Sequence, residues 1–405
     1  MKLYIACLFV CLSGPLAAAT VNVKSYGAAG DGVTNDTAAL NAAFQAGCSS
    51  SESVYLPTGV YLVDPLNMLN GCGVTFYGDG SNATILRFRS TLNTAVVQSL
   101  WSFGAGSGQT LTIRDLALQG KNAELAGLSI SGYLAVSLTN VNISNFGTPG
   151  YAQGHRSPYD GVYLINSTNA TISNSSFTGN ERYGVELQAV HYSTVSNSTM
   201  SGNGGMGGVS EENYAGPLDG PLVAQWVNNT LANNGSGGID VETASSLPPV
   251  QGVLQGNQVT NCGNNNWGSG WGLVIGLNGW GVIENNTVTK FAAQVPVTSY
   301  SNAIVYGANG GPIRILNNTI TGTAQYGILG NEGQYPVTIT GNTASSNGTG
   351  IFIYQSPGIQ LTNNILTSNV GAGISVYWSS PSLSGNQYSG NNPNLMINGT
   401  QATPQ

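Results

Sequence analysis

The most regular feature of this 405-residue sequence is a short phrase in which apolar and polar positions recur in a fixed order. An apolar residue is followed by two mostly polar positions rich in Asn, then by Ser or Thr, then by another apolar residue. Nine copies begin at Leu138, Ile172, Val195, Trp226, Leu254, Ile283, Ile315, Ile339 and Leu361. Successive copies lie 22 to 34 residues apart, which indicates a repeating coil of 22 to 24 residues that is lengthened by insertions.

A second short apolar segment follows most copies and begins near a glycine. These segments start at Gly161, Gly184, Gly208, Gly238, Gly327, Gly350 and Gly373. Apolar and polar residues alternate within them, and the spacing leaves no room for helices. The pattern predicts an all-β chain folded as a single-stranded parallel β-helix, a solenoid whose stacked strands run parallel.

The asparagines of the repeated phrase have a structural interpretation. Side-chain amides that occupy the same position in successive turns hydrogen-bond along the stack, so we expect a turn ladder. Trp226 occupies the inward apolar position of its phrase and is predicted to lie in the core.

The ends of the repeat region are predicted to differ from its middle. Residues 1–19 have the composition of an export signal, with Lys2, an apolar run and small residues before a cleavage site after Ala19. We therefore expect a secreted protein, extracellular or periplasmic. Residues 37–47 are predicted to form a helix that covers the open end of the solenoid, with Asp36 as N-cap and Gly47 as its stop.

These features predict one domain after the signal. Residues 20–405 form the β-helix, divided into an N-terminal cap at about 20–90, decorated central coils at about 138–315 and plain C-terminal coils at about 315–390. The longest insertions fall in the central coils. Loops on a rigid scaffold carry binding and catalytic residues, so the central coils are the expected place for a site.

Charge and cysteine content limit the partners. The net charge is −7 and only 10 residues are Lys or Arg, which argues against nucleic acid and anionic membranes. Export permits a disulfide between Cys48 and Cys72, but the spacing leaves the pairing open and says nothing of oligomeric state. The cysteines form no metal-ligand pattern, and we predict no metal and no cofactor.

The N-terminal region also carries a resemblance to a known family. The segments VNVKSYGAAGDGVTNDTAALNAAFQAG from Val21, VYLPTGVYLV from Val54 and VTFYGDGSNATIL from Val74 resemble the opening of the pectate lyase superfamily, the rhamnogalacturonase- and epimerase-like proteins. This resemblance implies a right-handed helix and a polysaccharide partner. It does not fix the reaction, since related proteins include lyases, hydrolases, epimerases and adhesins.

Aligning the second segments by their glycines gathers several of the 17 acidic residues in two outward columns. The first column contains Tyr163, Glu186, Ser210 and Asp240, and the second contains Ile165, Gln188, Glu212 and Glu242. Positions two coils apart are separated by roughly 9 to 10 Å, a spacing suited to a glycosidase acid and base. We predict glycoside hydrolysis with Glu186, Asp240 and Glu242 as acid and base candidates and Glu212 in support.

Two alternatives remain open. A uronate lyase or epimerase needs a base and a cation to neutralise the sugar carboxylate, and His155, Tyr159, Asp160 and Arg182 are candidates near His191, with Ca²⁺ as a further cation for a lyase. A non-catalytic carbohydrate-binding surface protein would need only aromatic stacking. Tyr163, Tyr183 and Trp271 are substrate-binding candidates in every case, and Tyr214, Trp267, Trp280, Tyr354 and Tyr377 are further aromatic residues of this kind.

Overall fold

The computed structural model describes residues 19–89, 99–104, 106, 108–123, 125–147, 159–211, 222–263, 270–289 and 301–403. The export signal predicted for residues 1–19 lies outside these ranges except for its last residue. Within them, no helix is long and apolar enough to cross a bilayer.

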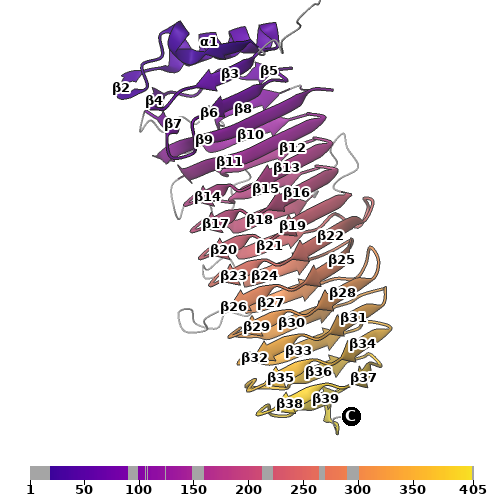
Figure 1. Cartoon of the computed structure of the whole chain (residues 1–405). Helices are drawn as coiled ribbons and strands as arrows, with labels where there is room; N and C mark the ends of the chain where they lie inside the picture. Colours follow the sequence, from indigo (N-terminus) through magenta and orange to yellow (C-terminus); the bar gives the residue numbers. More distant parts are fainter. Residues whose placement is uncertain are drawn as a thin grey trace, which may run out of the picture.

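The described chain is a solenoid of parallel strands, drawn from end to end in Figure 1. The larger sheet contains β1 (Thr20–Asn22), β2 (Asp31–Asn35), β3 (Ser53–Leu56), β4 (Gly59–Val63), β6 (Thr75–Gly78), β7 (Thr84–Phe88), β9 (Thr110–Ala123), β11 (Ala135–Phe146), β13 (Asn169–Ser173), β14 (Ser176–Thr178), β16 (Tyr192–Ser196), β17 (Thr199–Ser201), β19 (Val223–Val227), β20 (Thr230–Ala232), β22 (Val250–Gln255), β23 (Gln258–Thr260), β25 (Gly279–Glu284), β26 (Thr287–Thr289), β28 (Ile313–Leu316), β29 (Thr319–Thr321), β31 (Val337–Thr340), β32 (Thr343–Ser345), β34 (Ile359–Thr362), β35 (Ile365–Thr367), β37 (Ser382–Ser384) and β38 (Gln387–Ser389).

The smaller sheet takes the last strand of each coil. It contains β5 (Leu69–Asn70), β8 (Ser99–Gly104), β10 (Ala126–Ser131), β12 (Val162–Ile165), β15 (Val185–Gln188), β18 (Met206–Glu211), β21 (Gly237–Val241), β24 (Gly270–Ile275), β27 (Ser301–Tyr306), β30 (Tyr326–Asn331), β33 (Thr349–Tyr354), β36 (Ile374–Tyr377), β39 (Leu395–Ile397) and β40 (Thr400–Gln401). A typical coil therefore has three strands, such as β16, β17 and β18. The predicted parallel β-helix is confirmed, and only β40 is described pairing antiparallel, with β39.

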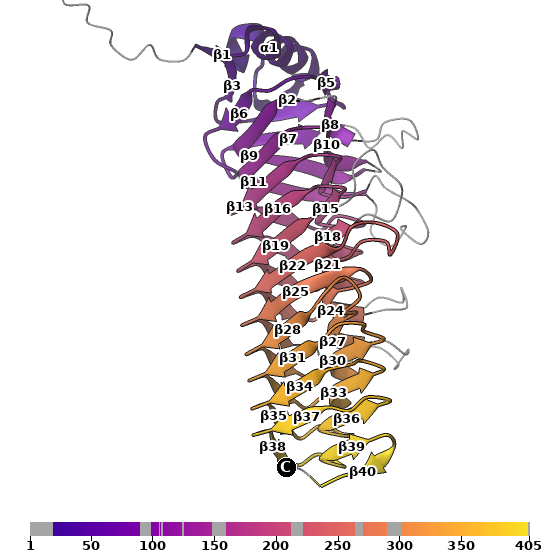
Figure 2. The same ribbon diagram turned by 90° about the vertical axis from the view of Figure 1, so that its right-hand side faces the viewer.

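The helix η1 (Val23–Tyr26) and the helix α1 (Thr37–Ser50) lie at the N-terminal end, where Figure 2 shows α1 capping the stack. The prediction that Gly47 ends α1 is wrong. The helix continues to Ser50. Gly47 is instead a packing residue: it is buried against the core, and a Cβ there would lie 2.3 Å from the Val54 side chain. The left-handed residue Ser51 follows the helix instead.

Asp36 does precede α1, but its carboxylate does not cap the helix. It accepts hydrogen bonds from the backbone amides of Ala29 and Gly30 at 2.6 and 3.0 Å, tying the preceding loop to the lid. A disulfide joins Cys48 of α1 to Cys72, which settles the pairing that the sequence left open.

The asparagine ladders are confirmed. The longer ladder runs through Asn229, Asn257, Asn286, Asn318, Asn342, Asn364 and Asn386, and a second includes Asn180, Asn203 and Asn234. In the longer ladder the Asn286 side-chain amide donates to Leu254 and Asn318 at 2.9 Å each, while its oxygen accepts from the side chain and backbone of Asn257. Every polar atom of that side chain is thus paired inside the stack.

Apolar residues fill the interior along its whole length. Trp226 is fully buried as predicted, and Phe44 of the lid packs on Phe76 and Trp101 with ring centroids 5.1 Å apart in each case. The continuous core keeps the coils in register, so outward side chains of the smaller sheet form rows along the axis.

Candidate functional site

The two outward columns of the central coils exist, but their register differs from the prediction at one coil. Val185 pairs with Gly208, so Glu186 pairs with Val209, and Val209 pairs in turn with Asp240. Glu186 and Asp240 therefore do share one column two coils apart, as predicted, with Val209 between them in place of Ser210.

The error arose because Gly207 and Gly208 are adjacent and either could be aligned with Gly184. The core decides between them. Ser210 faces inward and accepts a 3.1 Å hydrogen bond from the Trp226 indole, and a Cβ on Gly208 would lie 2.1 Å from the same ring. The bulk of Trp226 thus fixes a register that the local sequence leaves ambiguous.

The same one-residue shift changes which residues occupy the second column. Gln188 pairs with Glu211, and the pairing of Ser210 with Val241 brings Glu211 beside Glu242 in the next coil. The residue predicted for this position, Glu212, lies outside the described residues, and Glu211 takes the place assigned to it. Two carboxylates are therefore neighbours in this column.

A buried ion cluster lies at the start of the first column. The guanidinium of Arg182 donates to both carboxylate oxygens of Glu186, at 2.7 and 3.3 Å, and to Asp160 at 3.4 Å. Asp160 also accepts the backbone N–H of Tyr183 at 2.9 Å. Asp160 and Glu186 are 0% and 2% exposed, so this cluster is shielded from solvent. The sequence predicted all three residues but not that they form one unit.

The cluster holds two acids and one cation, and the pKa of the two acids is shifted to different extents. Burial raises the pKa of Glu186 well above its ordinary value, and the adjacent carboxylate of Asp160 adds to the rise although Arg182 opposes it. Burial also raises the pKa of Asp160, while Arg182 lowers it. Burial alone would lower the pKa of Arg182, but Asp160 and Glu186 outweigh it and raise the pKa, so Arg182 stays charged. Burial therefore disfavours the charged form of both acids, while Arg182 favours it.

Asp240 has a different environment. It is 6% exposed, and in the described part of the chain no hydrogen-bond donor reaches its Oδ1 atom. Burial raises the pKa of Asp240 well above its ordinary value, and the negative charges of Glu242 and Glu211 raise it further. A raised pKa favours the protonated form, which is the form that can give a proton to a substrate oxygen.

The predicted binding residues are distributed around these acids. Tyr163 precedes Glu186 in the first column and donates to Gln188 at 2.6 Å. The ring of Tyr183 lies 4.2 Å below the Arg182 guanidinium carbon. Trp271 lies in β24, where it pairs with Gly237 of the preceding coil, and it is half-buried, while Tyr159 lies just before Asp160.

The remaining predicted residues are elsewhere. Trp280 lies on β25 of the larger sheet, whereas the acids lie on the smaller sheet. His155, Tyr214 and Trp267 fall outside the described residues. His191 lies in the turn between β15 and β16, three residues after Gln188 of the second column. Among described residues, no three acidic, His or Cys side chains converge to hold a metal ion.

Two family models match the chain. One, described as rhamnogalacturonase A/epimerase, pectate lyase-like, matches residues 20–240, and the other, described as a right handed beta helix region, matches residues 219–392. Together they confirm the resemblance and the right-handed fold expected from the sequence.

Among curated proteins, the mannuronan C5-epimerase AlgE1 of Azotobacter vinelandii is 27% identical over 218 residues, which are 46% of this chain and 16% of that protein. The non-secreted LysM effector LysM19 of Penicillium expansum is 30% identical over 181 residues, which are 39% of this chain and 14% of that protein. The chain thus spans less than a fifth of the length of these two relatives.

Three solved structures share the fold. The A-module of mannuronan C-5 epimerase AlgE4 from Azotobacter vinelandii has a TM-score of 0.60 and 19% identity, covering 95% of this chain and 98% of its own. PfbA, a surface adhesin of Streptococcus pneumoniae, has a TM-score of 0.62 at 15% identity, covering 94% and 93%. A GH87 α-1,3-glucanase catalytic unit from Streptomyces thermodiastaticus has 0.54 at 16%, covering 94% and 66%.

Proposed function

The chain belongs to the rhamnogalacturonase A/epimerase, pectate lyase-like family, and from that premise we propose that it is a secreted enzyme acting on a polysaccharide. The polysaccharide would lie along the outward face of strands β12 to β24, which we call the central face. The observation that carries the proposal is Asp240, a buried acid on that face with a raised pKa and an Oδ1 atom that has no hydrogen-bond partner among the described residues. Buried acids perturbed in this way concentrate at catalytic sites.

We propose glycoside hydrolysis as the reaction. Burial and the acids Glu242 and Glu211 disfavour the charged form of Asp240, and its protonated form would donate a proton to the glycosidic oxygen. Glu242, two residues later on the same side, is half-buried and would serve as the carboxylate that activates water or stabilises the positive charge on the sugar.

The surroundings of Glu242 support substrate access. The next residues in its column are Gly276 and Gly307, so backbone rather than side chains borders the acid. A Cβ on Gly276 would lie 3.0 Å from the Glu242 carboxylate. Glycines at this register leave space for a sugar ring close to the acids. Tyr183 borders the other end of the central face and would bind the glycan there.

Elimination or epimerisation of a uronate is the second candidate, and the similarity to mannuronan C5-epimerases favours it. Arg182 would then neutralise the sugar carboxylate. The geometry weakens this role, because Asp160 and Glu186 already engage the same guanidinium. A purely binding protein is the third candidate, supported by the fold shared with an adhesin.

The test is incubation of the purified mature protein with a panel of neutral and uronate polysaccharides. New reducing ends, absorbance of unsaturated uronates and anomeric proton NMR signals are followed together. We expect reducing ends without the chromophore. The Asp240→Asn and Glu242→Gln variants should each lower kcat by a factor of about 10² to 10⁴, and Glu284→Gln on β25 should not.

Other outcomes would assign the other candidates. Chromophore formation would indicate elimination, and altered anomeric signals without chain cleavage would indicate epimerisation. Glu186→Gln separates the roles of the acids: a loss of kcat as large as that of Asp240→Asn would make Glu186 the catalytic partner. If none of the three readouts changes with any polysaccharide of the panel, the third candidate, a purely binding protein, would be favoured.

A further inference from the structure

The last coils of the solenoid carry an exposed tryptophan far from the acids. Trp378 follows β36, and 65% of its surface is exposed, which makes it the most exposed of the described large hydrophobic residues after Val370 and Val33. Its ring centroid lies 5.0 Å from that of Tyr354 in the preceding coil. Exposing a large apolar ring to water does not stabilise the fold, so an exposed ring at this position is consistent with a surface that binds a partner.

The backbone of Trp378 is also unfavourable for its side chain. Its φ is 50°, in the left-handed region that bulky residues rarely adopt. The equivalent turn residues of the two preceding coils, Glu332 and Gln355, share this conformation with φ of 46° and 49°. The turn therefore imposes the conformation, and a tryptophan occupies it despite the steric penalty.

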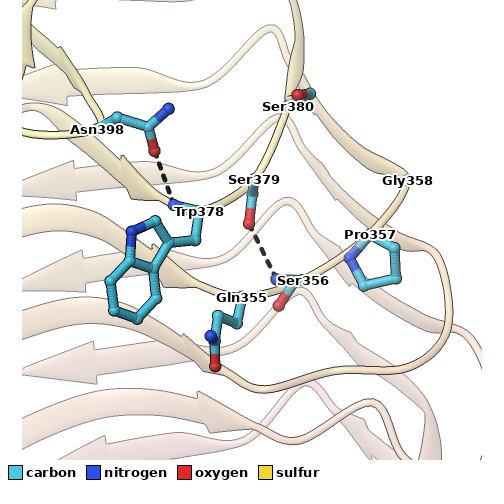
Figure 3. Close-up of a pocket in the computed structure, with 8 residues that line it drawn as sticks. All are labelled: Gln355, Ser356, Pro357, Gly358, Trp378, Ser379, Ser380 and Asn398. Carbon is cyan, nitrogen blue, oxygen red and sulfur yellow. Dashed lines mark hydrogen bonds between the residues drawn. The ribbon is translucent and has the colours of Figure 1, made fainter.

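Trp378 borders a cavity of about 660 Å³ lined by residues of the turns that follow β33, β36 and β39 (Figure 3). The other lining residues include Gln355, Ser356, Ser379, Ser380 and Asn398. Two hydrogen bonds fix its walls: Asn398 accepts the backbone N–H of Trp378 at 2.7 Å, and Ser379 accepts that of Ser356 at 2.9 Å. None of the described residues that line the cavity carries a charge.

We propose that this cavity is a second glycan-binding site and that it takes uncharged sugar rings. An aromatic face stacks on the apolar face of a sugar, and amide and hydroxyl groups bind its hydroxyls. Phosphate or carboxylate ligands would instead require Arg or Lys, and none is present among the lining residues. Glu332, in the equivalent turn two coils away, would further disfavour a uronate.

The inference rests on the proposed function, because it extends the same glycan-binding surface. From β21 to β36 the smaller sheet advances five coils, or about 24 Å along the axis. An outward aromatic row covers the later part of that distance: Tyr326 stacks on Phe352 at 4.5 Å, and Phe352 lies 5.7 Å from Tyr377. The site would hold a long, neutral polysaccharide while the central face acts on it.

The experiment is affinity gel electrophoresis with a polysaccharide cast in the gel. Mixed-linkage β-glucan, galactomannan and arabinoxylan are the neutral probes, and polygalacturonate and alginate are the charged ones. All proteins carry Asp240→Asn so that the probes stay intact. We expect retardation by a neutral probe and an increase in its dissociation constant of about tenfold or more in Trp378→Ala, the loss of one stacking contact. Trp378→Phe should retain most of the affinity.

Tyr26→Ala is the matched control, since Tyr26 is 42% exposed at the opposite end of the molecule. Gln355→Ala is a second probe of the cavity that leaves the tryptophan in place. Equal retardation of Trp378→Ala and its parent would overturn the proposal, as would retardation by the charged probes alone. A lower molar mass of Trp378→Ala in light scattering would show instead that a second copy of the chain covers the tryptophan.

Failure of this inference differs from failure of the proposed function. In the otherwise unmodified chain, Trp378→Ala should leave kcat on short oligosaccharides unchanged. If no turnover is ever detected but Trp378→Ala loses retardation, the binding site stands and the enzyme proposal fails. If turnover depends on Asp240 but retardation does not depend on Trp378, the enzyme proposal stands and the second binding site fails.

Discussion

The asparagine ladders and the acids of the central face are both buried polar groups on the same scaffold, yet their surroundings are opposite. Asn286 satisfies its side chain within the stack, through Asn257, Leu254 and Asn318. Asp240 is also buried, but its Oδ1 atom has no partner among the described residues. Burial and the neighbouring acids Glu242 and Glu211 disfavour its charged form.

This difference separates stability from chemistry. A ladder of neutral amides stabilises every coil it crosses, because each added coil completes the hydrogen bonds of the one before. Gathering acids on one face destabilises the folded state, so a reason for their presence must lie outside folding. The Arg182 cluster lies between these two cases, because its charges are buried like those of the acids but are paired with one another like the amides of the ladder.

Replacing Arg182 with Met should have the largest effect on stability. The substitution removes the only cation that contacts Asp160 and Glu186 in the described structure, leaving two buried acids without compensation. We expect a loss of about 3 to 5 kcal/mol in the free energy of unfolding near neutral pH, measured by urea denaturation. The loss should shrink at low pH, where both acids are protonated. A loss below 1 kcal/mol would show that solvent already compensates these acids.

Two adjacent asparagines offer a matched test of the ladder. Asn286→Ala leaves the backbone N–H of Asn257 without its acceptor, and we expect a loss of about 2 to 4 kcal/mol. Asn285→Ala changes an exposed residue with φ of 55° and should cost about 1 kcal/mol. Thermal and urea unfolding would measure both, and equal losses would contradict the ladder as the source of stability.

Asp240 should make stability depend on pH in a definite direction. Its folded pKa lies above its unfolded value, so between those two values the folded state binds more protons. The contribution of Asp240 is therefore fully present below the unfolded pKa and is lost as the pH rises through the folded pKa. Asp240→Asn should unfold at a higher temperature than the parent above neutral pH and at a similar temperature near pH 4. A lower melting temperature at every pH would show that the carboxylate has an unseen stabilising partner.

Gly276→Ala is expected to have the smallest effect and to sharpen the role of Glu242. The added Cβ lies 3.0 Å from the carboxylate, which must shift by a few tenths of an ångström. We expect kcat to fall by roughly threefold to tenfold with little change in melting temperature. An unchanged kcat would place Glu242 outside the reacting centre.

The repeated phrase was sufficient to predict the solenoid, because a side-chain alternation of two and a constant coil length allow few folds. The ladder and the buried Trp226 followed from the same regularity. Gly47 misled the helix end because glycine serves both as a helix stop and as a contact residue, and only the packing against Val54 distinguishes the two.

The candidate site was predicted as a region and as a set of residue types. Glu186, Asp240 and Glu242 were correctly placed on one outward face, but Glu211 was missed because two neighbouring glycines made the register ambiguous. Trp378 was missed as well, since nothing local distinguishes an exposed tryptophan from a buried one.

By itself, then, the sequence determined the repeat, the parallel strands, the capped N-terminal end and the face on which acids gather, since these follow from periodicity and composition. The tertiary structure decided which acid is paired with Arg182, which acid has an oxygen without a partner among the described residues, and which glycine faces Trp226. Those outcomes depend on contacts between coils 22 to 34 residues apart, where packing of bulky side chains and the balance of buried charge select one arrangement.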